Sequence, residues 1–403
     1  MRRQRTASKQ THFFAAVPRY TLHIMDVNSG MDEIRAWLTL LRAPALGAAA
    51  LRAALTRHGG ARQALERIRG DQSLAAAART ALAAADTQAI ASDLRWLEQP
   101  AHHLLTIADA DYPALLRDIP GAPLALFIAG DPTHLWSPQI AIVGARSATP
   151  SGLSNARSFA RAFAQSGNVV TSGLAEGIDG AAHAATLDAG GITVAVLGTG
   201  PDVVYPRQHR ALAERIRAHG ALVSEFPPGT AGKPEHFPRR NRIIAGLSLG
   251  TLVIEAGLKS GSLITARLAA EQGREVFALP GSIHSPLARG CHQLIRDGAM
   301  LVESADEVLD QLRAIGAKLA DHLRVRLAAP DAETAAARAA AGGPAIDAEH
   351  QRLRAALDHV PAGLDELATR SGLPIAALSS MLLVLELDGA VVADGGGRYA
   401  LAH

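Results

Sequence analysis

Short runs of apolar, mostly β-branched residues alternate with helix-length segments between about Leu104 and Glu303. The runs are LALFI, IAIVG, VVTSG, TVAVLG, ALVSE, TLVIE, EVFAL and AMLVE. Alternation of this kind is typical of βαβ units and predicts an α/β fold. Because the runs are continuously apolar, the strands are expected to be buried on both faces. The sequence therefore predicts a Rossmann-like core over residues 104–315, with a mostly parallel sheet and helices on both sides.

Two further regions flank this core, as expected for a chain of 403 residues, which exceeds what one hydrophobic core usually organises. Residues 31–103 are rich in Ala, Leu and Arg with helical spacing, which predicts a small helical domain of the SAM or helix-hairpin-helix type. Residues 316–345 form an Ala- and Gly-rich linker, and the helix, turn, helix and Gly-tipped hairpin of residues 346–403 indicate a winged-helix domain. Residues 1–30 precede the amphipathic pattern and are expected to be a disordered arm or the product of a start codon placed too early.

Composition narrows the class of protein and its compartment. The single cysteine, Cys291, excludes an internal disulfide and a multi-cysteine zinc site, and it suits a reducing compartment. No stretch approaches the ~18 consecutive apolar residues of a membrane-spanning helix. We therefore expect a cytoplasmic protein without a membrane partner. The net charge is only +2, so a nucleic-acid site must come from local clustering of charge.

Loops rich in Gly, Ser and Thr follow several of the predicted strands. They are the segments GARSAT from Gly144, SGLAEGID from Ser172, GTG from Gly198 and KSGS from Lys259. In an open parallel sheet these loops meet at the carboxyl edge, where helix N-termini offer N–H groups to anions. The loops therefore predict a phosphate-binding edge. None of them matches a standard nucleotide fingerprint, so no cofactor is expected.

The segment KPEHFPRRNR, residues 233–242, combines four cations with one acidic residue and one aromatic ring. Cations follow a phosphodiester backbone, and an aromatic ring such as Phe237 offers a face on which a base stacks. The segment is therefore typical of a site for single-stranded nucleic acid. The alternative is equally open: the arginines pair with acidic residues of the core, and Phe237 packs inward.

Together these motifs resemble the DNA-processing protein A family (DprA, also called Smf). The resemblance rests on IAIVGARSATPSG, TSGLAEGIDGAAH, VLGTGPDVVYP, SEFPPG, FPRRNRIIAGLS, VIEAGLKSGSLITARLAAEQGREVFALPG and GCHQLIRDGA, in order along residues 139–302. It implies a Rossmann-like core that binds and protects single-stranded DNA and helps to load the RecA recombinase during natural transformation. It also implies a homodimer through the Rossmann-like domain, a helical N-terminal domain and a winged-helix C-terminal domain.

The loops, the basic segment and the resemblance together give one set of expected DNA-binding residues. They are Gly144, Arg146, Ser147, Ser172, Gly173, Gly177, Lys233, Phe237, Arg239, Arg240, Asn241, Arg242, Lys259, Gly261, Ser262 and Thr265. We expect no catalytic residue and no metal ligand among them.

The main alternative is an enzyme, a nucleotide-phosphate hydrolase of the lysine-decarboxylase-like Rossmann group, with Glu255 as its catalytic carboxylate. The P-G-G loop of that group is replaced here by residues 247–249, LSL. Asp179 and His183 share one helix face and could suggest acid/base chemistry, but an N-cap and a packing residue are the simpler interpretation.

A transcription factor that reads duplex DNA through the C-terminal domain is a third possibility. Residues 346–403 carry four basic against eight acidic residues, a charge that phosphates repel. We therefore expect a role in protein contact or packing for this domain.

Overall fold

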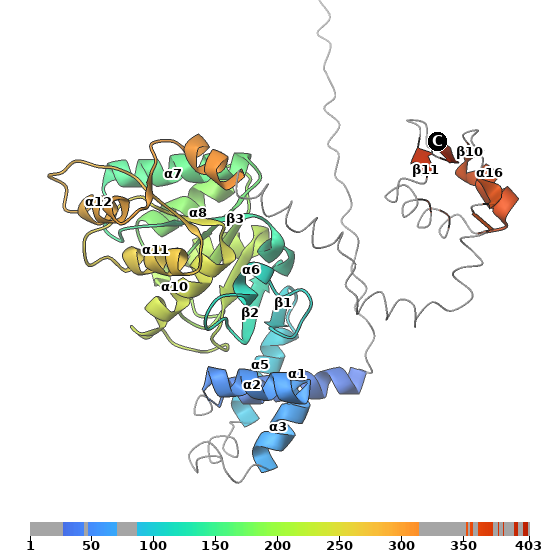
Figure 1. Ribbon diagram of the computed structural model, residues 1–403. Helices are drawn as coiled ribbons and strands as arrows, with labels where there is room; N and C mark the ends of the chain where they lie inside the picture. The colour runs from blue at the N-terminus through green and yellow to red at the C-terminus, as the bar shows by residue number, and fades with distance from the viewer. Residues whose placement is uncertain are drawn as a thin grey trace, which may run out of the picture. The chain divides into compact units, whose positions relative to one another are not determined.

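The computed structural model describes residues 27–43, 47–70 and 87–313 and parts of residues 352–401 (Figure 1). The chain divides into two compact units, residues 1–315 and 316–403. The expected linker over residues 316–345 and most of the expected N-terminal arm lie outside the described residues.

The first unit is built on a nine-stranded sheet with the order β1-β2-β6-β5-β4-β3-β7-β8-β9. The strands are β1 His102–Thr106, β2 Ala125–Gly130, β3 Gln139–Val143, β4 Val169–Ser172, β5 Thr193–Val196, β6 Ala221–Ser224, β7 Gly250–Val253, β8 Glu275–Ala278 and β9 Met300–Leu301. All eight predicted strands are present. Only the β1–β2 and β2–β6 pairs are antiparallel, so the prediction of a mostly parallel sheet is confirmed. The sequence did not predict β1, a partly buried edge strand that begins with two histidines.

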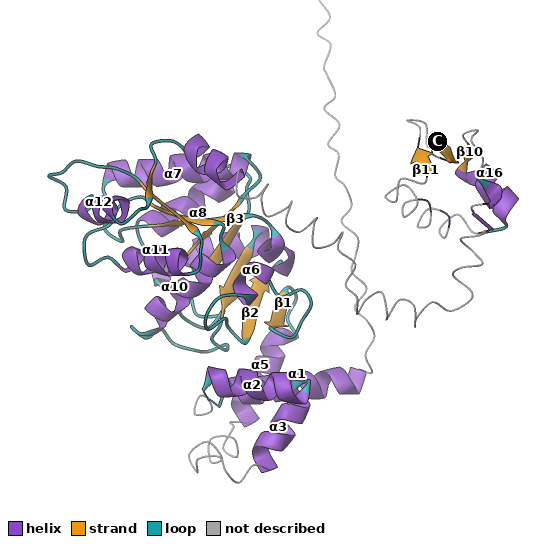
Figure 2. Cartoon of the chain, viewed as in Figure 1, coloured by secondary structure: helices purple, strands orange, loops and turns teal. Residues whose placement is uncertain are grey.

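Helices cover both faces of the sheet (Figure 2). They are α6 Ala114–Arg117, α7 Pro150–Gln165, α8 Ile178–Asp188, α9 Arg210–His219, α10 His236–Leu247, α11 Gly261–Glu271 and α12 Arg289–Arg296. Successive residues of β3 alternate between two clusters of buried side chains: Ala141 packs with residues of α10 and α11, and Ile142 packs with residues of α7 and α8. Burial on both faces explains why the strands read as continuous apolar runs.

Among the described residues before the sheet there are four helices: α1 Val27–Leu41, α2 Ala48–His58, α3 Ala61–Gly70 and α5 Thr87–Leu97. Helix α1 begins at Val27, four residues before Met31, where the sequence pattern placed its start. Trp37 belongs to a cluster formed mainly by the helices, with Leu124 beside it, whereas Leu38 packs with Phe127 of β2 and Leu222 of β6. The N-terminal helices are therefore attached to the β2–β6 side of the sheet.

The second unit has a helix and a small antiparallel sheet. Its described elements are β10 Ala362–Gly363, α16 Leu364–Ser371, β11 Val391–Ala393 and β12 Arg398–Leu401, with the strand order β10-β12-β11. Leu353, Leu367 and Leu382 are among the buried residues of its core. These elements agree with the predicted winged-helix domain. Throughout the described part of both units, no helix has the length and apolar character needed to cross a membrane.

Candidate nucleic-acid interface

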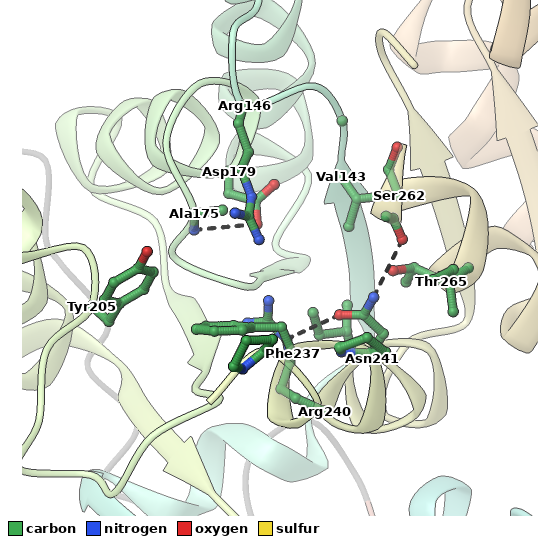
Figure 3. Close-up of a pocket in the computed structure, with 16 residues that line it drawn as sticks. Val143, Arg146, Ala175, Asp179, Tyr205, Phe237, Arg240, Asn241, Ser262 and Thr265 are labelled. Atoms are coloured by element: carbon green, nitrogen blue, oxygen red, sulfur yellow. Dashed lines mark hydrogen bonds between the residues drawn. The ribbon is translucent and has the colours of Figure 1, made fainter. Parts of the chain in front are cut away.

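An open pocket of about 330 Å³ lies at the carboxyl ends of the central strands. The strand order reverses between β3 and β7, which is where ligands of open α/β sheets bind. Of the residues expected from the sequence, the pocket brings together Gly144, Arg146, Phe237, Arg240, Asn241, Gly261, Ser262 and Thr265 (Figure 3). These residues come from the loop after β3 and from the first turns of α10 and α11.

One side of the pocket is formed by two aromatic rings and a guanidinium group. The Cζ of Arg146 lies 5.8 Å from the centroid of the Phe237 ring, and the ring of Tyr205 lies 5.3 Å from that of Phe237 at 44°. Arg146 is exposed, and Tyr205 keeps 50% of its surface exposed. A cation beside stacking surfaces is the chemistry that binds a nucleotide. Sequence reasoning missed Tyr205, although it stands at the end of the VLGTGPDVVYP motif.

Arg240 forms the floor of the pocket and is only 5% exposed. Its Nη1 donates hydrogen bonds to the carbonyl oxygens of Gly173 and Val196, and its Nε donates to the Oδ1 of Asn241 at 3.0 Å. Burial lowers the pKa of Arg240 to about 10. The guanidinium therefore ties the loop after β4 to β5 and α10, which is a structural role at the base of the site.

Asp179 accepts hydrogen bonds from backbone N–H groups that the sequence had suggested as phosphate donors. Its Oδ2 accepts hydrogen bonds from the N–H of Gly173 at 3.1 Å and from that of Ala175 at 3.4 Å, the second of which is drawn in Figure 3. The hydroxyl of Ser172 donates to the carbonyl of Ile142 at 2.6 Å. Ser172 and Gly173 therefore shape this loop through internal bonds, and we do not retain them as phosphate ligands. Burial raises the pKa of Asp179, and the nearby charge of Arg240 opposes that shift.

Two predicted glycines are explained by close packing of backbone. Gly177 has a φ of 76° and is the N-cap of α8, the place that the sequence had suggested for Asp179. A Cβ at Gly177 would lie 2.3 Å from the carbonyl oxygen of Ala145, and one at Gly144 would lie 2.6 Å from Ile178. The loops after β3 and β4 therefore touch without room for side chains, which holds Arg146 at the pocket.

The first turn of α11 forms the opposite wall. Ser262 and Thr265 are nearly buried, and the Nδ2 of Asn241 donates to the carbonyl of Gly261 at 3.3 Å (Figure 3). The hydroxyl of Ser260 caps the helix by accepting from the N–H of Ser262 at 3.4 Å. The helix N-terminus thus faces the pocket with its positive end.

Other predicted residues lie elsewhere. Lys233, Arg239 and Arg242 line a second hollow, a groove of about 670 Å³ on the other side of the α10 N-terminus. Arg239 and Arg242 both contact the buried carboxylate of Glu225, at 2.9 and 2.8 Å. Pairing with an acidic residue of the core, left open by the sequence, is thus correct for these two arginines. Ser147 and Lys259 are exposed and line neither hollow.

The carboxylate of Glu255, the catalytic residue of the enzyme alternative, is engaged in hydrogen bonds within the fold. Glu255 accepts hydrogen bonds from the backbone N–H of Thr149 at 2.9 Å and from its hydroxyl at 2.6 Å, so it anchors the N-terminus of α7. His183 is fully buried, and its Nδ1 contacts the hydroxyl of Thr193 at 2.7 Å. Within the described residues, no group of His, Cys, Asp and Glu side chains is arranged to hold a metal ion.

Known proteins resemble the chain over most of its length. The family model "DNA recombination-mediator protein A" matches residues 103–313, and the model "DprA winged helix domain" matches residues 328–397. Protein Smf of Escherichia coli is 43% identical over 315 residues, which cover 78% of this chain and 81% of that protein. The putative DNA processing protein DprA of Mycobacterium tuberculosis is 37% identical over 387 residues, covering 91% and 95%. The X-ray structure of DNA processing protein A from Streptococcus pneumoniae superimposes with a TM-score of 0.60 at 36% identity, covering 68% of this chain and 95% of that one.

Proposed function

The chain belongs to the DNA recombination-mediator protein A (DprA/Smf) family, and on this premise we propose that it binds single-stranded DNA in the pocket between β3 and β7. The observation that carries the proposal is the group formed by Arg146, Phe237 and Tyr205. The guanidinium of Arg146 binds a phosphate, and the two rings stack with a base. Stacking accepts every base, so sequence preference is slight.

The charge around the pocket supports this assignment. Arg146 forms no salt bridge within the described part of the chain, so its guanidinium is available to a phosphate. Arg240 adds a second positive charge beneath the pocket, and the N-terminus of α11 adds a partial one. Among the described residues that line the pocket, Asp179 is the one carboxylate.

The protein acts by binding without turnover. The carboxylate of Glu255 is held by Thr149, and Asp179 is held by two backbone N–H groups, so both are committed to folding the loops. In the cytoplasm the bound strand is protected and passed to the RecA recombinase during natural transformation, as the family resemblance implies.

Homodimerisation through the Rossmann-like domain is part of the same proposal. Large apolar side chains are exposed near the β7–β9 edge: Leu258 at 59%, Ile283 at 74% and Leu301 at 44%. The loops after β7 and β8 contact each other, since the N–H of Ala256 donates to the carbonyl of Leu287. Exposed large apolar residues in this part of the fold support an interaction surface there.

The function is tested by fluorescence anisotropy with labelled single-stranded and duplex oligonucleotides. We expect Arg146→Ala to weaken single-strand binding about tenfold or more, because a charge-assisted hydrogen bond contributes about 1.5–3 kcal/mol. The logarithm of the wild-type association constant should fall linearly with the logarithm of the salt concentration, with a slope of about 0.7 for each phosphate contacted.

Arg161→Ala is the matched control, since Arg161 is an exposed arginine of α7 on the opposite face of the sheet. Its affinity should equal that of the wild type. Equal binding of duplex and single strand, or no single-strand binding at all, would contradict the proposal and reopen an assay for nucleotide hydrolysis.

A further inference from the structure

We propose that the groove on the far side of α10, between the N-terminal helices and the core, is a second subsite for the same DNA strand. The inference rests on the proposed function of the first pocket. It makes the N-terminal helices part of the DNA-binding surface. The ligand is the phosphodiester backbone of the nucleotides next to those held by Arg146 and Phe237.

Helix α10 and the segment before it separate the two hollows. Pro234, Phe237 and Asn241 line the first pocket, whereas Lys233, His236 and Arg239 line the groove. Residues three or four apart share one face of a helix, so one short element presents different side chains to each hollow. A strand that leaves the pocket over the α10 N-terminus enters the groove directly.

The charge of the groove fits a phosphate backbone. The described part of its lining contains four cations, Arg42, Lys233, Arg239 and Arg242, and one carboxylate, Glu225. Glu225 is shared by two arginines, and Arg42 is paired with Asp93, which lies behind the lining. The groove therefore keeps an excess of positive charge after its internal ion pairs are counted. Lys233 is exposed, and within the described residues its ammonium group forms no hydrogen bond or salt bridge.

The groove also offers a stacking surface. The guanidinium of Arg239 lies over the ring of Phe226, with Cζ 5.4 Å from the centroid, and the side chain remains 57% exposed. Arg239 is held in place by its bond to Glu225. An ordered guanidinium plane stacks with bases in the way that an aromatic ring does. Apolar residues, among them Leu40, Leu51 and Leu124, complete the lining and suit sugars and base faces.

The N-terminal helices supply one wall of the groove, and Ala48 provides a way to test it. Ala48 is exposed and is the first residue of α2, directly after the N-cap Gly47. A glutamate at this position is compatible with the helix, because the helix dipole favours negative charge in the first turn. Ala48→Glu therefore places a charge that repels phosphate in the groove without disturbing the fold. Ala48→Gln has nearly the same size without the charge and is the matched reference.

The experiment measures the affinity of full-length protein for oligothymidylates lengthened one nucleotide at a time. Short oligomers fill the first pocket alone, and longer ones reach the groove. We expect Ala48→Glu, relative to Ala48→Gln, to weaken binding of the longer oligomers about two- to fivefold, the range of one exposed ion pair. We expect Lys233→Ala to weaken binding of the longer oligomers by a similar factor. It should also reduce the slope of log affinity against log salt concentration by about 0.7, the contribution of one phosphate on a single strand.

Three outcomes are distinguishable. A loss that begins only above a certain oligomer length supports the subsite. Equal affinities of Ala48→Glu and Ala48→Gln at every length, with Arg146→Ala still defective, overturn the subsite and leave the proposed function intact. Absence of single-strand binding by the wild type at every length overturns both.

Discussion

Arg240 shows how one buried charge organises the site. Among the described residues it has no carboxylate within salt-bridge distance, and its donors go to two backbone carbonyls and to Asn241. A Cβ at Gly173 would lie 2.3 Å from its Nη1, so a glycine is required where the guanidinium passes the loop. The segment RRNR thus contains one buried structural arginine and two arginines that share Glu225.

His183 provides a pH-dependent prediction. Burial lowers its pKa to about 3 from 6.5, so the folded protein holds it neutral. Between these values the unfolded chain binds one more proton, and stability falls as the pH drops below 6.5. The loss is at most about 1.4 kcal/mol per pH unit. His183→Gln, which stays uncharged, should lose less stability between pH 7 and pH 4 in urea unfolding. If the free energy of unfolding fell by the same amount with pH in the variant and in the wild type, His183 would not be buried as a neutral group.

At the level of single elements, α7 depends on a residue from another strand. Its N-cap Thr149 is bonded to Glu255, which follows β7, so the carboxylate joins two segments at the point where the strand order reverses. We expect Glu255→Ala to lower the free energy of unfolding by about 1–2 kcal/mol, as loss of a helix cap does.

A second substitution at this position, Glu255→Gln, separates the structural role from the enzyme alternative. Glu255→Gln keeps one of the two acceptor oxygens in a similar place and replaces the other with an NH2 donor. Its stability should therefore lie between those of Glu255→Ala and the wild type, and single-strand affinity should be retained in both variants. A hydrolytic activity present in the wild type and absent from Glu255→Gln would contradict this account.

The elements of the core could be predicted from the sequence because burial on both faces leaves a local record in each strand. β1 left no such record, since it is a short edge strand with partial burial. The partners of the arginines could not be predicted. Glu225 lies 14 and 17 positions before Arg239 and Arg242, and its contact depends on how β6 and α10 pack. The loops after β3 and β4 were correctly placed near the pocket, but whether their N–H groups were free depended on Asp179.

In the molecule as a whole, the exposed apolar residues at the β7–β9 edge predict a dimer. Ile283→Asp should shift the mass measured by light scattering from that of two chains toward that of one, because burial of a charge at an apolar interface is unfavourable. Met31→Asp, which alters an apolar residue of α1 with 48% exposure, is the control and should remain dimeric. A wild type that is monomeric at all concentrations would contradict the dimer, and an Ile283→Asp variant that remains dimeric would place the interface elsewhere.

The position of α10 between two hollows has a mechanical consequence. A nucleic acid that occupied both would have to turn around the end of one helix, an object about 10–12 Å across. Duplex DNA keeps its direction over about 50 nm and cannot follow such a curve without a large elastic penalty. A single strand has no stacked partner to resist the turn. Stiffness alone would then favour single-stranded over duplex DNA, independently of any contact with bases or sugars.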